Sequence, residues 1–362
     1  MANRRAILIS AIMTLLVLSS CNNTGLTPLI DPRDYVWTLD TLDTPMNLIC
    51  SIWGSSPTDV WAAGPGGTIY DYLWHYDGKR WIPWYATYHG EKGLAYCTGE
   101  ALFGFSANNV WMGGQSLGDP GAGLCHWDGT RWGRYFNYNP QPDTFGLVSI
   151  RQIWGRRPND IYAVGLMLYW SKLARDGTSR GFILHYDGST WREILRTDSG
   201  YQYHFLELTG SQNNVYVTEY QENTENRDSS LVTLYELSGN RLIKLYSNTL
   251  GDGLVSVAVI DDKLYLCVGV HNAKVYLHSG GKFIEQFSVN DLGFLVGRNE
   301  KDIFLAMSDG VAHFNGADIR YLYRFPRKYL VSNSAVFERE VFFCIYDGAT
   351  GTNMILHGRL RQ

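Results

Sequence analysis

The chain has few of the short motifs that signal catalysis. Its 362 residues contain no glycine-rich phosphate loop, no run of alternating aspartates typical of a calcium loop and no His-x-x-x-His zinc pair. No Cys-x-x-Cys pair occurs either. The sequence therefore predicts no catalytic residue, no metal site and no cofactor.

Charge of one sign and long apolar runs are also scarce. Lys and Arg number 31 against 35 Asp and Glu, for a net charge of −4. Proteins that bind nucleic acid usually carry a strong basic patch, so no nucleic-acid partner is expected. After residue 21 no apolar run approaches the roughly 18 residues of a membrane span.

One short phrase is abundant. A turn-forming polar residue, an aliphatic residue and an aromatic residue follow one another in seven places, whose middle residues lie 38 to 54 positions apart. The copies are 59–61, 109–111, 160–162, 214–216, 263–265, 302–304 and 340–342. A repeat of this length, built of short strands and turns, predicts an all-β chain folded as a seven-bladed β-propeller.

The fuller repeat predicts four antiparallel strands in each blade, a to d. Aromatic and β-branched segments are bounded by Gly, Pro, Asn or Asp, and an Asp-Gly pair marks the c–d hairpin turn. The seventh copy ends after its third strand. We expect the N-terminal segment 35–39 to supply the missing outer strand and so to close the ring, because an open stack would leave unpaired edges.

Two repeat families share features with this pattern. The Gly113-Gly114 pair after strand b, and the Tyr-to-Trp spacing across strands c and d, resemble kelch repeats. The Asp-Gly-x-x-Trp segment, as in 77–81, resembles the Asp-box of sialidase-like propellers, although its Asp and Gly are adjacent here. The resemblance implies a propeller across residues 33–362 and no particular subfamily or function.

The first 21 residues form a separate unit. Arg4 and Arg5 give a basic start, residues 6–17 an apolar core, and Leu18-Ser19-Ser20-Cys21 a small-residue cleavage site. This resembles a bacterial lipoprotein signal with a complete lipobox. An ordinary signal peptide and a membrane helix are the alternatives, although the apolar run is short for a span.

The resemblance implies a division of the chain and an address. Residues 1–20 would be a signal peptide, 21–32 a tether lipidated at Cys21, and 33–362 the propeller. Several acyl chains on Cys21 would give stable membrane anchoring. Asn22 follows the cysteine, which by resemblance to diderm lipoproteins implies the outer membrane of a bacterial cell envelope and leaves the leaflet open.

Histidine and cysteine recur without suggesting chemistry. His75, His126, His185 and His313 occupy one slot in four blades, with His357 a candidate fifth. Equivalent slots lie far apart around a ring, so we expect structural hydrogen bonds near the c–d turn rather than a metal or catalytic site. The cysteines Cys50, Cys97, Cys125, Cys267 and Cys344 are expected to be buried apolar residues, with a Cys50–Cys97 disulfide as the alternative.

Function is expected where the blades differ. Long insertions fall in the b–c connections (114–123, 165–181 and 219–230) and in the d–a connections (82–98, 133–149 and 193–206), which emerge on one face of a propeller. Candidate ligand-binding residues there are Tyr85, Tyr88, Tyr135, Tyr138, Trp170, Arg175, Tyr203, His204, Arg227 and Asp228. The alternative is that these residues merely cover the ring.

Two functions remain open. The first is a lipid-anchored module that binds a protein or glycan through the loop face of blades 1 to 4. The second is a glycan-active hydrolase or lyase at the same face. Most glycoside hydrolysis needs paired carboxylates, for which Glu91, Glu207, Glu219 and Asp228 are the candidates.

The lipobox makes a direct prediction. Cys21→Ser should abolish acylation and release the protein into the soluble fraction, because serine cannot form the thioether that carries the lipid. Metabolic labelling with a palmitate analogue, followed by membrane fractionation, measures both effects. Label on the Cys21→Ser protein, or its retention on membranes after a high-salt wash, would show that the lipoprotein assignment is wrong.

Overall fold

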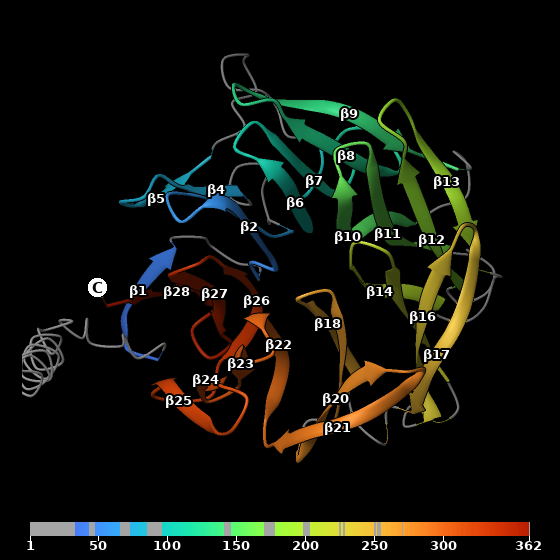
Figure 1. The fold of residues 1–362 in the computed structure, drawn as a ribbon. Coiled ribbons are helices and arrows are strands. Elements are labelled where there is room, and N and C mark those ends of the chain that lie inside the picture. Colours follow the sequence, from blue (N-terminus) through green and yellow to red (C-terminus); the bar gives the residue numbers. More distant parts are fainter. Residues whose placement is uncertain are drawn as a thin grey trace, which may run out of the picture.

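The computed structural model is a ring of seven four-stranded antiparallel sheets, which confirms the predicted all-β propeller (Figure 1). It describes residues 33–42, 48–65, 73–84, 96–140, 146–169, 178–197, 203–223, 226, 229–249, 251, 255–269 and 271–361. No helix in these ranges is long and apolar enough to cross a membrane.

The first four blades follow one another in chain order, each running from the inner to the outer strand. Blade 1 contains β2 (Ser51–Ser56), β3 (Asp59–Ala63), β4 (Leu73–Tyr76) and β5 (Trp81–Pro83). Blade 2 contains β6 (Ala101–Ser106), β7 (Asn109–Gln115), β8 (Ala122–Trp127) and β9 (Trp132–Tyr138). Blade 3 contains β10 (Leu147–Arg157), β11 (Asp160–Tyr169), β12 (Thr178–Tyr186) and β13 (Trp191–Arg196). Blade 4 contains β14 (Tyr203–Gly210), β15 (Val215–Gln221), β16 (Leu231–Ser238) and β17 (Arg241–Thr249).

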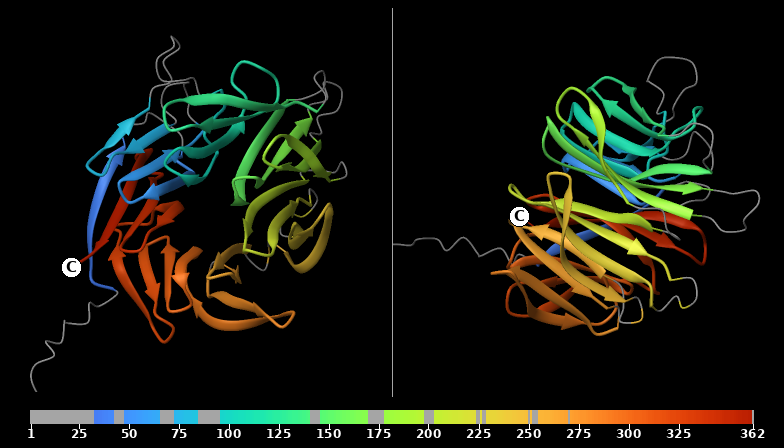
Figure 2. Two further views of the ribbon diagram at one scale, coloured as in Figure 1. Left: turned by 45° about the horizontal axis from the view of Figure 1, so that its top comes forward. Right: turned by 90° about the vertical axis from the view of Figure 1, so that its right-hand side faces the viewer.

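The last three blades complete the ring (Figure 2). Blade 5 contains β18 (Val255–Ile260), β19 (Lys263–Val268), β20 (Ala273–Ser279) and β21 (Lys282–Val289). Blade 6 contains β22 (Leu292–Asn299), β23 (Asp302–Met307), β24 (Gly310–Phe314) and β25 (Ile319–Arg324). Blade 7 contains β26 (Leu330–Val336), β27 (Glu340–Asp347) and β28 (Thr352–Leu360), with β1 (Tyr35–Leu42) as its outer strand.

The N-terminal strand closes the ring as predicted. β1 pairs antiparallel with β28 along its whole length, from Tyr35 opposite Leu360 to Leu42 opposite Asn353. Trp37 lies opposite Gly358, where an added Cβ would come within 2.5 Å of the indole ring. The side chains of β1 and β28 join one apolar cluster with blade 6. Blade 7 is therefore assembled from both ends of the chain.

The predicted histidine slot is structural, and its partner is the polar residue that opens each repeated phrase. His75, His185 and His313 bond the aspartates that begin strand b, at 2.6, 2.9 and 2.8 Å. His126 bonds Asn109 at 3.0 Å and His357 bonds Glu340 at 2.6 Å. In all five blades the histidine ring also packs on the aromatic residue of the same phrase. The two repeated signals are therefore halves of one contact that joins strands b and c.

These contacts change the acidity of the carboxyl groups. Burial by itself would raise the pKa of Asp59, but hydrogen bonds with His75 and Ser55 hold it below its ordinary value. In blade 6 the same balance, with His313 and Arg298 as partners, lowers the pKa of Asp302. Both carboxylates therefore stay ionised in the folded protein, and each keeps its hydrogen bond to histidine.

The predicted insertions are to a large extent longer strands, which corrects the expectation of loops. β10, β11 and β12 have 11, 10 and 9 residues, whereas β2, β3 and β4 of blade 1 have 6, 5 and 4. Extra backbone in blade 3 continues the ladder, because strand pairing satisfies its N–H and C=O groups. The strands of blade 3 are therefore longer than those of blade 1, and the blade extends further along the strand direction.

Ring closure predicts a sharp length dependence. A protein that begins at residue 33 should unfold in one cooperative transition, whereas one that begins at residue 43 should lose it, because β28 becomes an open edge and its apolar neighbours are exposed. Circular dichroism during thermal unfolding compares the two. Equal midpoints would contradict the role given to β1.

Candidate functional site

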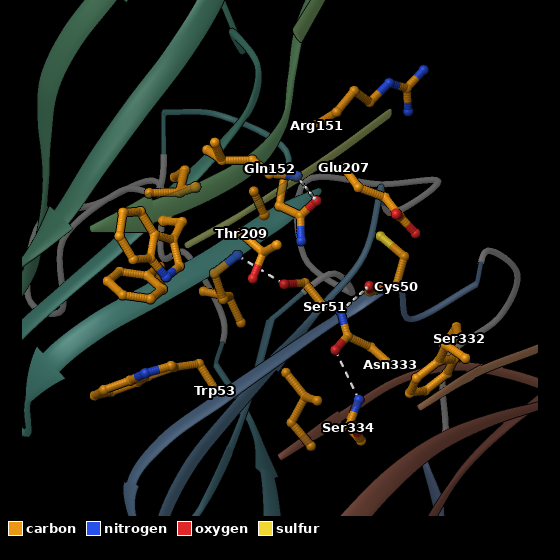
Figure 3. Close-up of a pocket in the computed structure, with 18 of the residues that line it drawn as sticks. Cys50, Ser51, Trp53, Arg151, Gln152, Glu207, Thr209, Ser332, Asn333 and Ser334 are labelled. Carbon is orange, nitrogen blue, oxygen red and sulfur yellow. Dashed lines mark hydrogen bonds between the residues drawn. The ribbon is translucent and has the colours of Figure 1, made fainter. Parts of the chain in front are cut away.

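A cavity of about 740 Å³ lies in the central channel and is lined by the inner strands of all seven blades (Figure 3). The lining segments are 50–53, 100–103, 151–154, 207–209, 256–259, 294–296 and 332–334, together with Leu166 of β11. Because the inner strands of all seven blades border the channel, the fold brings together residues that are several tens of positions apart in sequence.

Charge is concentrated at one end of the channel. In blades 1 to 3 a polar residue comes first along the lining segment and an aromatic residue follows, as in Glu100 before Phe103 and Arg151 before Trp154. The lining segments of blades 4, 5 and 7 also begin with a polar residue: Glu207, Ser256 and Ser332. Since a d–a connection leads into each inner strand, the polar end lies on the face of the d–a and b–c connections. We call this polar end the channel mouth, formed by Cys50, Glu100, Arg151, Gln152, Glu207, Ser332 and Asn333.

An ion pair joins blades 2 and 3 at the channel mouth. The Arg151 guanidinium donates to Glu100 Oε2 at 2.6 Å, and Ser149 Oγ donates to Glu100 Oε1 at 2.7 Å. Only 8 % of the Glu100 side chain is exposed, compared with 43 % of Arg151. The carboxylate is thus held in place by blade 3, while the guanidinium is open to solvent.

Glu207 is a carboxyl group at the mouth whose acidity is strongly changed by its surroundings. It projects from β14, and its Oε2 accepts a hydrogen bond from the Val257 amide of blade 5 at 3.0 Å. Burial raises the pKa of Glu207 to about 7, against opposing hydrogen bonds from Val257 and Ser256. This carboxyl group changes charge near neutral pH, which is unusual for glutamate.

Other polar side chains around the mouth also bridge neighbouring blades. Ser51 Oγ accepts from the Leu102 amide, Gln152 Oε1 accepts from the Leu208 amide, and the Asn333 amide donates to the Cys50 carbonyl, at 2.8, 2.8 and 3.0 Å. Gln152 in blade 3 and Glu207 in blade 4 thus make equivalent bridges to the next blade. These hydrogen bonds hold neighbouring blades together, and the same side chains contribute polar surface to the cavity.

The Cys50 thiol at the mouth is not a nucleophile. Burial and the neighbouring Glu100 raise the pKa of Cys50 to about 12, so the thiol stays protonated at neutral pH. Cys50 does not pair with Cys97 in the structure, where the Cys97 sulfur lies 3.1 Å from that of Cys125 instead. Cys50 lies just before β2.

The mouth is chemically suited to binding. Carboxylate, guanidinium, amide and hydroxyl groups converge there, and no histidine is among its lining residues. Within the described ranges, no three His, Cys, Asp or Glu side chains gather as metal ligands. Hydrogen bonds to hydroxyl groups or to a peptide are the interactions that this lining provides.

Most of the sequence-predicted site residues lie outside the ranges that the structure describes. Cys21 and the loop candidates Tyr85, Tyr88, Trp170, Arg175, Arg227 and Asp228 are outside the described residues. Tyr203 and His204 lie in β14, the inner strand that also carries Glu207, rather than in a loop. The ligand-binding role of all these residues stays a prediction.

Tyr135 and Tyr138 lie on the outer strand β9 and contact blade 3, which corrects their expected place in a loop. The Tyr135 hydroxyl lies 2.5 Å from that of Tyr186. Tyr138 is 7 % exposed, packs on Phe182 and donates to Glu193. Burial and the Glu193 carboxylate raise the pKa of Tyr138. Both tyrosines therefore take part in packing between blades.

Sequence reasoning missed the channel mouth apart from Glu207. The repeat itself contained a signal for the mouth. A polar residue stands three or four positions before the inner-strand glycine in two blades: Glu100 before Gly104, and Arg151 and Gln152 before Gly155. The sequence also contains one match to the Gly-x-Ser-x-Gly nucleophile motif, at residues 177–181. Ser179 is buried inside β12 opposite Leu168, and not on the strand-to-helix turn that this motif requires.

Comparison with known proteins establishes the fold alone. No protein-family model matches the chain, and no curated protein matches its sequence. The uncomplexed acylaminoacyl peptidase of Pyrococcus horikoshii is similar in structure, with a TM-score of 0.54 and 9 % identity over 88 % of this chain and 53 % of the peptidase. Its orthorhombic crystal form gives 0.53 and 10 % over 85 % and 49 %. The chain thus spans about half the length of these peptidases, and its kelch and Asp-box resemblance stays a prediction.

Glu207 predicts a pH-dependent stability. Its folded pKa of about 7 exceeds the ordinary 4.5, so the folded state binds the proton more tightly, and stability falls as pH rises from about 4.5 to 7. Glu207→Gln should match wild type near pH 4 and exceed it at pH 8 by up to about 3 kcal/mol. Urea unfolding at both pH values measures the difference.

The amide oxygen of the variant can still accept from Val257, as Gln152 does from Leu208. The exposed Glu338→Gln controls for the loss of one surface charge. A Glu207→Gln protein that follows the wild-type pH dependence would show that Glu207 titrates as an ordinary glutamate.

Proposed function

We propose that the protein is a lipid-anchored binding module of the bacterial cell envelope, whose protein or glycan ligand sits over the channel mouth. The observation that carries the proposal is the gathering of Arg151, Glu207 and Asn333, from blades 3, 4 and 7, at one end of a cavity of about 740 Å³. Ligand sites are commonly cavities of roughly 300–1,000 Å³ with a few convergent polar groups.

The face around the mouth favours a large ligand. The long strands of blade 3 end on the same side, at the connections 170–177 and 141–145, and those of blade 4 end at 222–230. The predicted residues Trp170, Arg175, Arg227 and Asp228 belong to these connections. A ligand over the mouth would touch inner-strand polar groups at its centre and loop residues at its edge, which suits a polypeptide or an oligosaccharide better than a small metabolite.

The path of the chain also fits a membrane-anchored binder. Arg33, where the proposed tether ends, docks on the c–d turn of blade 6: its side chain donates to His313 Nδ1 at 3.1 Å and to the Asp318 carbonyl at 2.7 Å. That turn lies on the face opposite the channel mouth. The anchor would then attach to the propeller on the face away from the mouth, which suits a mouth that receives a ligand.

The alternative, a glycan-active hydrolase or lyase, has weaker support. Glu207 projects toward blade 5, where it accepts from Val257. Glu219 is two residues from Val217, which packs against blade 3, and bonds the Tyr235 hydroxyl. The two carboxylates therefore lie on opposite faces of the blade 4 sheet, whereas hydrolysis needs them to flank one bond. Glu91 and Asp228 lie outside the described residues.

Binding predicts a difference between the two faces. Full-length lipidated protein in detergent should retain a ligand on a glycan array or in a crosslinking experiment with envelope extract. Arg151→Ala, at the mouth, and Trp170→Ala, at a loop position predicted from the sequence, should each weaken that binding at least about tenfold. The matched controls Lys79→Ala and Arg80→Ala, on the opposite turn face, should leave it unchanged.

Two outcomes would contradict the proposal. If only the Lys79→Ala and Arg80→Ala variants lose binding, the ligand sits on the c–d turn face and not over the channel mouth. Release of shortened oligosaccharides from a bound glycan, abolished by Glu207→Gln, would favour the hydrolase or lyase.

A further inference from the structure

We propose that Cys97 and Cys125 are joined by a disulfide in the exported protein. Their sulfur atoms lie 3.1 Å apart, and both side chains are fully buried. Cys97 precedes β6, where it forms an isolated bridge with Ser116, and Cys125 lies in β8 of the same blade. The oxidation site is therefore internal to blade 2.

The surroundings hold the two sulfurs in register. The Tyr96 amide donates to Cys125 Sγ at 3.2 Å, and Cys97 Sγ donates to the Met112 carbonyl at 3.6 Å. Backbone hydrogen bonds from Thr98 to Gln115 and from Leu117 to Tyr96 fix the segment that carries Cys97 against β7 and the turn after it. Formation of the bond thus needs a small approach of two side chains and no rearrangement of strands.

The chemistry requires an external oxidant, which we take to be a thiol–disulfide donor of the cell envelope. One cysteine thiolate attacks a donor sulfur, forms a mixed disulfide and displaces a donor thiolate. The second cysteine then attacks the mixed disulfide and releases the other donor thiolate. Two cysteine thiols lose two protons and two electrons, and the donor disulfide is reduced to two thiols.

Burial determines when the reaction takes place. Burial, followed by the neighbouring Cys125, raises the pKa of the Cys97 thiol well above its ordinary value, so the folded reduced pair supplies little thiolate. The bond therefore forms while blade 2 is assembling. Once formed, it fastens the end of the 82–98 connection to strand β8 on the mouth side of the ring, so the edge of the proposed site is held in place.

The test uses the full chain expressed for export in a bacterial host and lysed in denaturant that contains N-ethylmaleimide, so that buried thiols are also alkylated. Non-reducing digestion and mass spectrometry should give one peptide pair linked through Cys97 and Cys125, while Cys267 carries maleimide. Recovery of both cysteines as maleimide adducts from envelope-located protein would overturn the proposal, as would a Cys50–Cys97 link.

A second arm separates this inference from the proposed export, on which it rests. Full-length Cys21→Ser protein, reduced and unfolded, is refolded in a mixture of oxidised and reduced glutathione. The intact mass should fall by two hydrogens, and the unfolding midpoint should rise by a few degrees relative to refolding with excess reductant. Cys97→Ala with Cys125→Ala should abolish both changes, and Cys267→Ala should abolish neither. Unchanged mass in glutathione would overturn the disulfide even if export is correct.

Discussion

The fold depends on packing every blade between two neighbours. Seven separate four-stranded sheets would each expose two apolar faces, and isolated sheets of this size bury too little surface to be stable. Here the inner strands pack around a common axis, and adjacent sheets bury aromatic residues against one another. The arrangement is complete only because β1 pairs with β28, so that the two ends of the chain share blade 7.

Closure also creates the chemistry of the centre. When the seven inner strands converge, their inward-facing polar groups must be satisfied, and several do so by bonding the backbone of the next blade, as Gln152 and Glu207 do. The same groups then line one end of the channel. The Glu207 carboxyl group is held where burial opposes its ionisation, and Arg151 extends toward solvent from its pair with Glu100. Structural bridges and a binding surface are thus formed by one set of residues.

Much of the fold could be predicted from the sequence because its signals are local. The repeated phrase, the Asp-Gly turns and the histidine slot each act within one blade, and the count of strands indicated where the closing strand must come from. The mouth could not be found in this way, because Glu207 and Val257 meet across blades and are 50 positions apart. The sequence predicted loops where the strands of blades 2 to 4 continue, because the polar and irregular composition of these segments does not show the alternation typical of paired strands. For the loop candidates such as Trp170 and Arg227, the structure adds no placement.

Hydrogen exchange at the junction of the two chain ends tests ring closure most directly. In the full-length protein at neutral pH, the amides of β28, and the β1 amides that bond β28, should exchange as slowly as those of β27, because pairing with β1 makes β28 an interior strand of the blade 7 sheet. Fast exchange of β1 together with the edge of β28, beside a protected β27, would contradict a closed ring and the channel built upon it.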